Sequence, residues 1–192
     1  MGSGNVSGFK KNCVRGRGIL LFEDEASFRQ DPTLFRSWFR IGSEPQVLTL
    51  GQRNTQHVYG AVSIIPFGHF SYHFINKGEK FNADTHQKFL LMLLHKFYPR
   101  KIFLIQDNAS YHKNPDMLSW FEAHRQKIKH IPLPSHSPEL NATEPLWGYT
   151  RRETTHNNFF AHVNDLISGL KHTFRKIQYH PELIGNYIQP YV

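Results

Sequence analysis

The 192-residue sequence has only one cysteine, Cys13, so an internal disulfide cannot form. It also lacks the run of roughly 18 to 20 apolar residues that crosses a bilayer, and its N-terminus has no apolar signal-peptide segment. Low-complexity tracts and internal repeats are missing, which argues against a disordered or repetitive chain. These absences lead us to expect a globular protein of the reducing cytoplasm, without a membrane partner.

Acidic residues are outnumbered by basic ones. The chain has 23 lysines and arginines against 15 aspartates and glutamates, a formal net charge of +8, and 13 histidines in addition. Lys and Arg that contact phosphates release condensed counterions, so this excess suits a nucleic acid, although many proteins are simply basic. No two histidines have the spacing of a zincin or a zinc finger, so we expect no zinc site.

The length fits one domain. We interpret residues 1–16 as a basic leader that includes part of an expression tag, and residues 17–192 as the folded domain. Trp38 and Trp120 are expected in the core. A hairpin followed by alternating strands and helices is typical of an α/β fold, with a mixed central sheet flanked by helices. The expected elements are a strand at 19–22, hairpin strands at 57–65 and 70–75, a helix from Asn82 or Asp84 to Tyr98, a strand at 101–106, a helix with Pro115 in its first turn, a strand at 128–133, a helix near Glu144 and a helix over 163–177.

Two aspartates follow strands of the buried type, because the runs LLFED and FLIQD end at Asp24 and Asp107. If these strands are parallel neighbours, both carboxylates emerge at one edge of the sheet, where sites of open α/β sheets collect. Glu144 opens a helix after the last strand and can lean over the same edge. Three converging carboxylates repel one another unless cations neutralise them, and oxygen ligands favour Mg²⁺ or Mn²⁺. Two such ions would serve phosphoryl transfer.

Each carboxylate also has a purely structural interpretation. Glu144 has capping-box spacing, with Asn141 as the cap. Asp107, followed by Asn108, is also typical of a turn. Asp24 lies between Glu23 and Glu25, and one of these three acids would merely face solvent. The position of both aspartates at strand ends favours a site, while the pattern alone leaves the family open.

Four segments resemble the DDE transposases of the mariner and insertion-sequence-630 superfamily, namely DEASF at 24–28, WFRIGSEP at 38–45, QDNASYH at 106–112 and LPSHSPELNATEPLWG at 133–148. The likeness extends from about residue 19 to 160, and the last segment is the most specific because its Ser-Pro-x-Leu-Asn, Glu-Pro and Trp recur in order. The sequence departs from the family pattern at His136, where Tyr is more usual, and at Ala142 and Thr143, where Pro-Ile is common. Neither departure removes a carboxylate.

The resemblance implies an RNase H-like fold, with Asp24, Asp107 and Glu144 as catalytic residues and metal ligands. It implies Mg²⁺ or Mn²⁺, two ions in all, and an endonuclease that cuts and joins DNA during transposition. The expected partners are transposon ends and target DNA, a second copy of the chain in a homodimer, and a separately encoded helix-turn-helix part, because this sequence has no N-terminal helix-turn-helix domain. The expected location is then the nucleoid of a bacterium, or the nucleus if the source is eukaryotic.

Neighbours of the three acids are candidates for supporting or DNA-contacting roles. Turn chemistry and solvated surface charge explain them as well, Asn141 is expected to brace its loop, and Trp147 is expected to pack in the core. Two other functions stay open, an RNase H-like nuclease that cuts without joining and a domesticated domain that binds DNA or protein without catalysis. The candidate neighbours are Asn108, His112, Asn141, Arg151 and Arg152.

Overall fold

A mixed five-stranded sheet in the order β3-β2-β1-β4-β5 forms the centre of the computed structural model, which describes residues 18–51, 53–134, 137 and 140–188. β1, β2 and β3 form an antiparallel ribbon, and β4 runs parallel to both β1 and β5. The mixed sheet expected from the sequence is therefore confirmed. The strands are β1 (Ile19–Arg29), β2 (Thr55–Ile65), β3 (Phe67–Phe74), β4 (Ile102–Gln106) and β5 (Ile128–Pro132).

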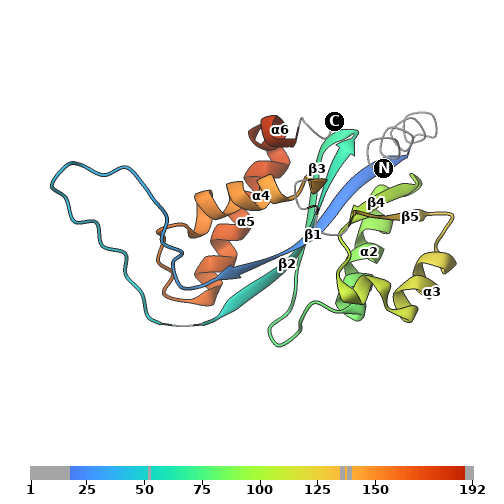
Figure 1. Cartoon of the computed structure of the whole chain (residues 1–192), viewed down its shortest axis with the longest axis horizontal. Helices are drawn as coiled ribbons and strands as arrows, with labels where there is room; N and C mark the ends of the chain where they lie inside the picture. Colours follow the sequence, from blue (N-terminus) through green and yellow to red (C-terminus); the bar gives the residue numbers. More distant parts are fainter. Residues whose placement is uncertain (1–17, 52, 135–136, 138–139, 189–192) are drawn as a thin grey trace.

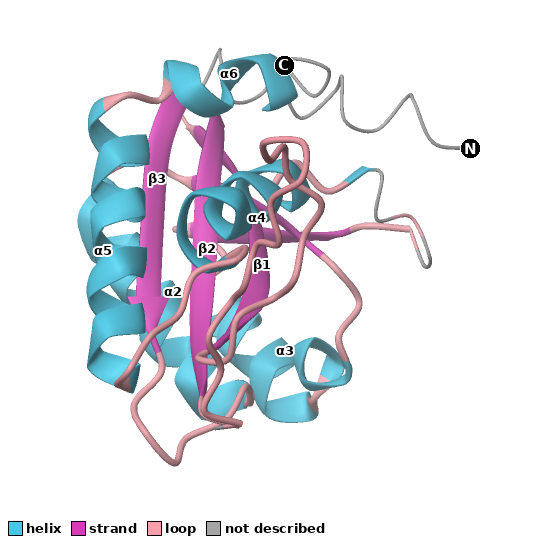
Figure 2. Ribbon diagram, turned by 90° about the vertical axis from the view of Figure 1, so that its left-hand side faces the viewer, coloured by secondary structure: helices cyan, strands magenta, loops and turns pink. Residues whose placement is uncertain are grey.

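Helices cover both faces of the sheet (Figure 1, Figure 2). α2 and α3 contribute to the core on one face, and α4, α5 and α6 to the core on the other. Among the described residues, no helix has the length and hydropathy needed to span a membrane. The helical segments are α2 (Ala83–Phe97), the 3-10 turn η1 (Ser110–Lys113), α3 (Pro115–Ala123), α4 (Glu144–Thr150), the π-helical turn η3 (Arg151–Thr155), α5 (Val163–Tyr179) and α6 (Glu182–Ile188).

Successive side chains at the start of β1 enter two different cores. Leu20 and Phe22 pack with α4, α5 and α6, whereas Ile19 and Leu21 pack with α2 and α3. Side chains of a strand alternate between the two faces, so a strand covered on both faces needs an apolar residue at every position. This requirement explains the continuous apolar run at the start of the strand.

β1 and β4 are parallel neighbours, and their pairing ends where Phe22 lies opposite Ile105. β1 itself continues along β2 to Arg29, with Asp24 opposite Gly60. The expected parallel arrangement is confirmed, but the expectation that the strand ends at Asp24 was wrong. The strand extends past Asp24 because β2 continues to pair with it up to Arg29, after its pairing with β4 has ended. Asp24 therefore lies just beyond the point where β4 stops covering the edge of β1.

The connection between β1 and β2 projects from the sheet as a long arm (Figure 1), defined here as residues 34–51. Trp38 and Ile41 in the arm are 100% exposed, so the expectation that Trp38 lies in the core was wrong. The arm makes its described contacts near its base, where Phe35 stacks on His156 and hydrogen-bonds with Asn157. Trp120 does pack against the core beneath α2 and α3.

Candidate active site

A hollow of about 440 Å³ brings together the three acidic residues singled out in the sequence. Asp24 comes from β1, Asp107 directly follows β4, and Glu144 begins α4. Three segments far apart in the sequence thus present carboxylates to one cavity. The other lining residues are Asn108, Ala109, Lys113, Leu133, Pro134, Ser137 and Asn141.

Asp24 is contacted by two residues that flank Glu144. The Trp147 indole N–H donates to Asp24 Oδ2 at 3.2 Å, and Thr143 Oγ1 lies 3.1 Å from the same oxygen. Burial, together with the negative charges of Glu25 and Glu23, raises the pKa of Asp24 to about 7. A carboxyl group in this setting gains strongly from a nearby cation.

Trp147 reaches Asp24 because β2 has a glycine at the facing position. A Cβ atom on Gly60 would lie 2.3 Å from Cη2 of Trp147, so only glycine leaves room for the indole. The ring is 1% exposed and packs edge-on against Phe28 and Phe70. The expected packing role of Trp147 is confirmed. Its hydrogen bond to Asp24 was not expected, because the two residues are remote in the sequence.

Asp107 occupies a turn and is also held by His112. The backbone N–H of Ala109 donates to Asp107 Oδ1 at 2.9 Å, so the turn expected as a structural interpretation is present. His112 Nδ1 lies 3.3 Å from the same oxygen and 3.2 Å from the backbone carbonyl oxygen of Asp107. Hydrogen bonding with His112 lowers the pKa of Asp107, so Asp107 ionises at a lower pH than Asp24.

His112 is a buried link between two acids. Its side chain is 1% exposed, and its Nε2 lies 3.3 Å from Oε1 of Glu25. Burial opposes charge on the imidazole, but the nearby carboxylates of Asp107, Glu25 and Glu23 raise the pKa of His112 to about 10. The described contacts of His112 are thus with acidic side chains around the hollow. Glu25 was not singled out in the sequence.

Glu144 is the first residue of α4, and its side chain is exposed in the hollow. The N-cap residue is Thr143, and no side-chain cap hydrogen bond forms there. The capping box considered for Asn141 and Glu144 is therefore absent. Glu144 lies where a ligand in the hollow can meet it.

Two asparagines brace the loops around the hollow. Asn108 Nδ2 donates to the carbonyl oxygen of Leu133, which ties the end of β4 to the end of β5. Asn141 Oδ1 accepts from the backbone N–H of Thr143 at 3.2 Å and lies 2.6 Å from its hydroxyl. That hydroxyl is within reach of both Asn141 and Asp24, and its single hydrogen serves one of them at a time.

The candidate arginines lie outside the hollow. Arg151 and Arg152 belong to η3, beyond α4; the Arg151 guanidinium lies over the ring of Phe28, 5.8 Å from its centroid, and Arg152 is exposed. Lys113 is the only lysine or arginine among the described lining residues, and it was missed in the sequence. His136 and the leader at residues 1–16 lie outside the described residues.

The donor set at the hollow fits a hard divalent cation. All three candidate ligands are carboxylates, which favour Mg²⁺ or Mn²⁺ over zinc. Burial first, and then the charges of Glu25 and Glu23, raise the pKa of Asp24, so its ionised form lacks compensation from the surrounding protein. A cation in the hollow would supply that compensation.

Comparison with known proteins gives a family match and two curated relatives. The model of the DDE superfamily endonucleases matches residues 19–167. The chain is 29% identical over 181 residues to the transposable element Tc3 transposase of Caenorhabditis elegans, covering 88% of this chain and 52% of the relative. It is 26% identical over 164 residues to the insertion element IS630 uncharacterized 39 kDa protein of Shigella sonnei, covering 84% and 46%. The chain thus spans about half the length of these relatives.

Solved structures of Mos1 mariner transposase share the fold. The paired-end complex with Mg superposes with a TM-score of 0.67 at 16% identity, over 97% of this chain and 56% of that one. The isolated catalytic domain gives a TM-score of 0.58 at 14% identity, over 97% and 87%. The RNase H-like architecture expected from the resemblance is thereby confirmed.

Proposed function

The chain belongs to the DDE superfamily endonucleases, and from this premise we propose that it is the catalytic domain of a DNA transposase. Asp24, Asp107 and Glu144 would be its catalytic residues. The observation that carries the proposal is their convergence on one hollow from β1, the end of β4 and the start of α4. Both aspartates are held by hydrogen bonds from groups outside the triad, which supports a defined ligand geometry.

The triad would bind Mg²⁺ or Mn²⁺, two ions in all. Bound ions would activate the attacking hydroxyl group and stabilise the leaving oxygen. The chain itself contributes positioning: Trp147 and Thr143 orient Asp24, and His112 fixes Asp107. Mos1 paired-end complexes have been solved with Mn and with Mg, which supports this choice of ions.

The proposed reaction has two phosphoryl-transfer steps. In the first, the oxygen of water bonds to a phosphorus atom at the transposon end, and the bond from phosphorus to the 3′ oxygen breaks. The products are a 3′-hydroxyl and a 5′-phosphate. In the second, the oxygen of that 3′-hydroxyl bonds to a phosphorus atom of target DNA. The target's own bond from that phosphorus to its 3′ oxygen breaks, which leaves a 3′-hydroxyl on the target strand. Neither step needs a covalent bond to the protein.

Transposon ends and target DNA would be the substrates. The net charge of +8 and the position of Lys113 in the hollow support a polyanionic substrate, and Arg151 and Arg152 would contact phosphates beyond the hollow. A Mos1 complex with its left transposon end has been solved. A DNA substrate would place the chain in a bacterial nucleoid or a nucleus.

We also propose that the chain acts as a homodimer, and with a separately encoded helix-turn-helix part that recognises the transposon ends. Trp38 and Ile41, fully exposed on the arm, support contact with a second copy, because large apolar side chains in water favour association. Self-association would be measured by sedimentation of the purified chain.

Two measurements test the function. Given DNA with pre-cut 3′-hydroxyl ends and Mn²⁺, the purified chain should join those ends to target DNA. Cutting without joining would point to a nuclease instead. In calorimetry, wild-type chain should bind Mn²⁺ and Asp24→Ala should bind it far more weakly. Equal binding by the two would favour a domain that contacts DNA or protein without catalysis.

A further inference from the structure

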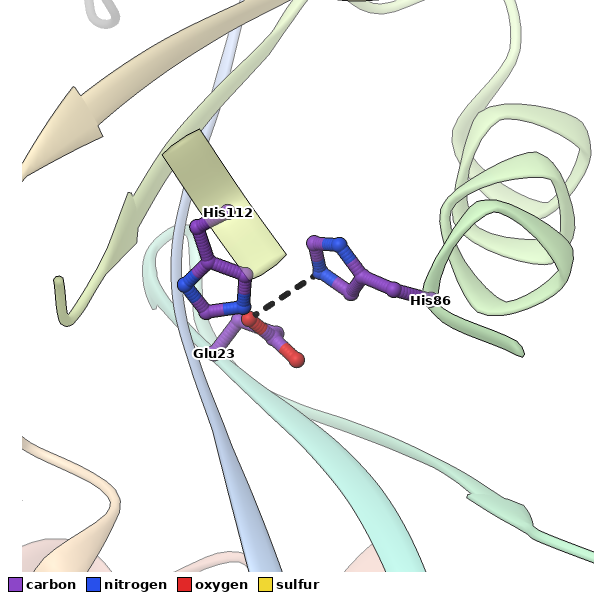
Figure 3. A group of neighbouring side chains, drawn as sticks. All are labelled: Glu23, His86 and His112. Carbon is purple, nitrogen blue, oxygen red and sulfur yellow. Dashed lines mark ion pairs between the residues drawn. The ribbon is translucent and has the colours of Figure 1, made fainter. Parts of the chain in front are cut away.

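A second cluster of potential ligands lies behind the hollow, on the face of the sheet covered by α2. Glu23 comes from β1, His86 from the first turns of α2, and His112 from η1. One candidate ligand atom from each lies within 4.8 Å of the others. Figure 3 shows the two imidazole rings on either side of the Glu23 carboxylate, with His86 Nε2 3.5 Å from Glu23 Oε2.

All three side chains are buried, and their inward-facing polar atoms have no hydrogen-bond partner. Glu23 and His86 are 0% exposed and His112 is 1% exposed. Both oxygens of Glu23, both ring nitrogens of His86 and Nε2 of His112 are buried without a hydrogen bond. Buried polar atoms are almost always satisfied in folded proteins, and a concentration of unsatisfied ones points to an additional bound group.

The donor chemistry identifies that group. Two imidazole nitrogens and one carboxylate oxygen are ligands for zinc and similar late first-row ions, whereas Mg²⁺ prefers oxygen ligands alone. We propose that Glu23, His86 and His112 form a zinc-class metal site, separate from the carboxylate site in the hollow. The spacing of the histidines in the sequence does not indicate this set, because the three residues come from three separate elements.

The second nitrogen of His112 supports the same assignment. A metal-bound histidine commonly donates its other ring N–H to a carboxylate or a backbone carbonyl oxygen. His112 Nδ1 lies 3.3 Å from Asp107 Oδ1 and 3.2 Å from the Asp107 carbonyl oxygen, while Nε2 faces the buried cluster. Glu25 Oε1 lies 3.3 Å from the same Nε2 and is also buried without a hydrogen bond, so a further carboxylate oxygen lies beside His112.

A metal ion bound by Glu23, His86 and His112 would have a structural role. By fixing the His112 ring, it would fix the group that holds Asp107 at the edge of the hollow. The proposal does not depend on the proposed function, because metal content and metal spectra can be measured without DNA.

The test is metal binding by the tag-free chain. Protein produced with added zinc should keep about one equivalent after dialysis against excess Mg²⁺, because imidazole ligands exclude Mg²⁺. The metal-free chain titrated with Co²⁺ should develop the visible absorption of a four-coordinate cobalt site. Zinc-free protein together with a featureless Co²⁺ titration would overturn the proposal.

Variants locate the ion. His86→Gln and Glu23→Gln should each weaken Co²⁺ binding at least tenfold, while His95→Gln, an exposed histidine on the same helix, should bind like wild type. Asp24→Asn, in the other site, should leave the Co²⁺ spectrum unchanged. Circular dichroism verifies that each variant folds. If a variant does not fold, the Co²⁺ spectrum and zinc content of the wild-type chain still test the proposal. Wild-type Co²⁺ binding by folded His86→Gln, or loss of the spectrum in folded Asp24→Asn, would contradict the site.

Discussion

The indole N–H of Trp147 donates to Oδ2 of Asp24 across 3.2 Å, and it can do so only because Gly60, opposite Asp24 on β2, leaves space for the ring. A packing residue of α4 thereby orients a proposed metal ligand of β1. Thr143 contacts Asp24 as well. These two contacts connect the start of α4 to the sheet. The helix that supplies the third acid thus also positions the first.

Trp147→Phe should separate packing from positioning. The phenyl ring keeps most of the apolar contact but has no N–H for Asp24. Loss of such a supporting hydrogen bond should weaken Mn²⁺ affinity about tenfold or more, with a far smaller effect on the melting temperature. Calorimetry and thermal unfolding measure the two quantities. Wild-type Mn²⁺ affinity in Trp147→Phe would show that the hydrogen bond does not position Asp24.

Gly60→Ala should destabilise the fold. Its Cβ would lie 2.3 Å from Trp147 Cη2, so the buried ring would have to move, at a cost of about 1–3 kcal/mol or more in unfolding free energy. Gly148→Ala on α4 is the matched control, because its Cβ would meet only the Arg152 side chain at 3.7 Å. Denaturant titrations should rank Gly148→Ala at or above wild type in stability and Gly60→Ala well below it; the reverse order would refute the close packing of Trp147 on Gly60.

Much of the sheet follows from the sequence. The apolar runs at the start of β1 and in β4 indicate strands covered on both faces, and the two strands are indeed parallel neighbours. The hairpin around Pro66 and the cap at Asn82 also match local signals. Each of these features depends on residues close together in the chain, either as a run of apolar residues or as a turn or cap signal.

Other features depend on contacts that no local pattern reveals. Trp38 is of a residue type common in cores, yet it is exposed because the arm projects away from the sheet (Figure 1). Glu23, His86 and His112 meet only because β1, α2 and η1 pack together. The hydrogen bond from Trp147 to Asp24 likewise required the three-dimensional arrangement.

Stability of the metal-free chain should fall as pH rises above neutral, and His112 should cause part of that fall. The pKa of His112 is raised from 6.5 to about 10, so the folded state binds more protons than the unfolded state between these values. This contribution is fully present below about pH 6.5 and is lost as pH rises toward 10. With a chelator present, His112→Asn should show a shallower decrease in unfolding free energy from pH 7 to 9.5. Equal slopes would mean that His112 is not charged in the folded chain.

Trp38→Ala should leave the fold intact. The side chain is 100% exposed, so its removal should change the unfolding free energy by less than about 0.5 kcal/mol. If the arm contacts a second copy, the same variant should shift sedimentation toward the monomer. A large loss of thermal stability would show that Trp38 is packed in solution, and an unchanged dimer would remove Trp38 from the interface.

Asp24, Asp107 and Glu144 are proposed to act together on DNA. The most direct measurement is Mg²⁺- or Mn²⁺-dependent DNA cleavage by wild type, Asp107→Asn and Glu144→Gln, each purified and verified as folded by circular dichroism. Asn and Gln keep the size of the side chain and remove the charge that holds the cation. Wild type should cleave the DNA, and neither variant should cleave it above background. Full cleavage by either folded variant would contradict the proposal.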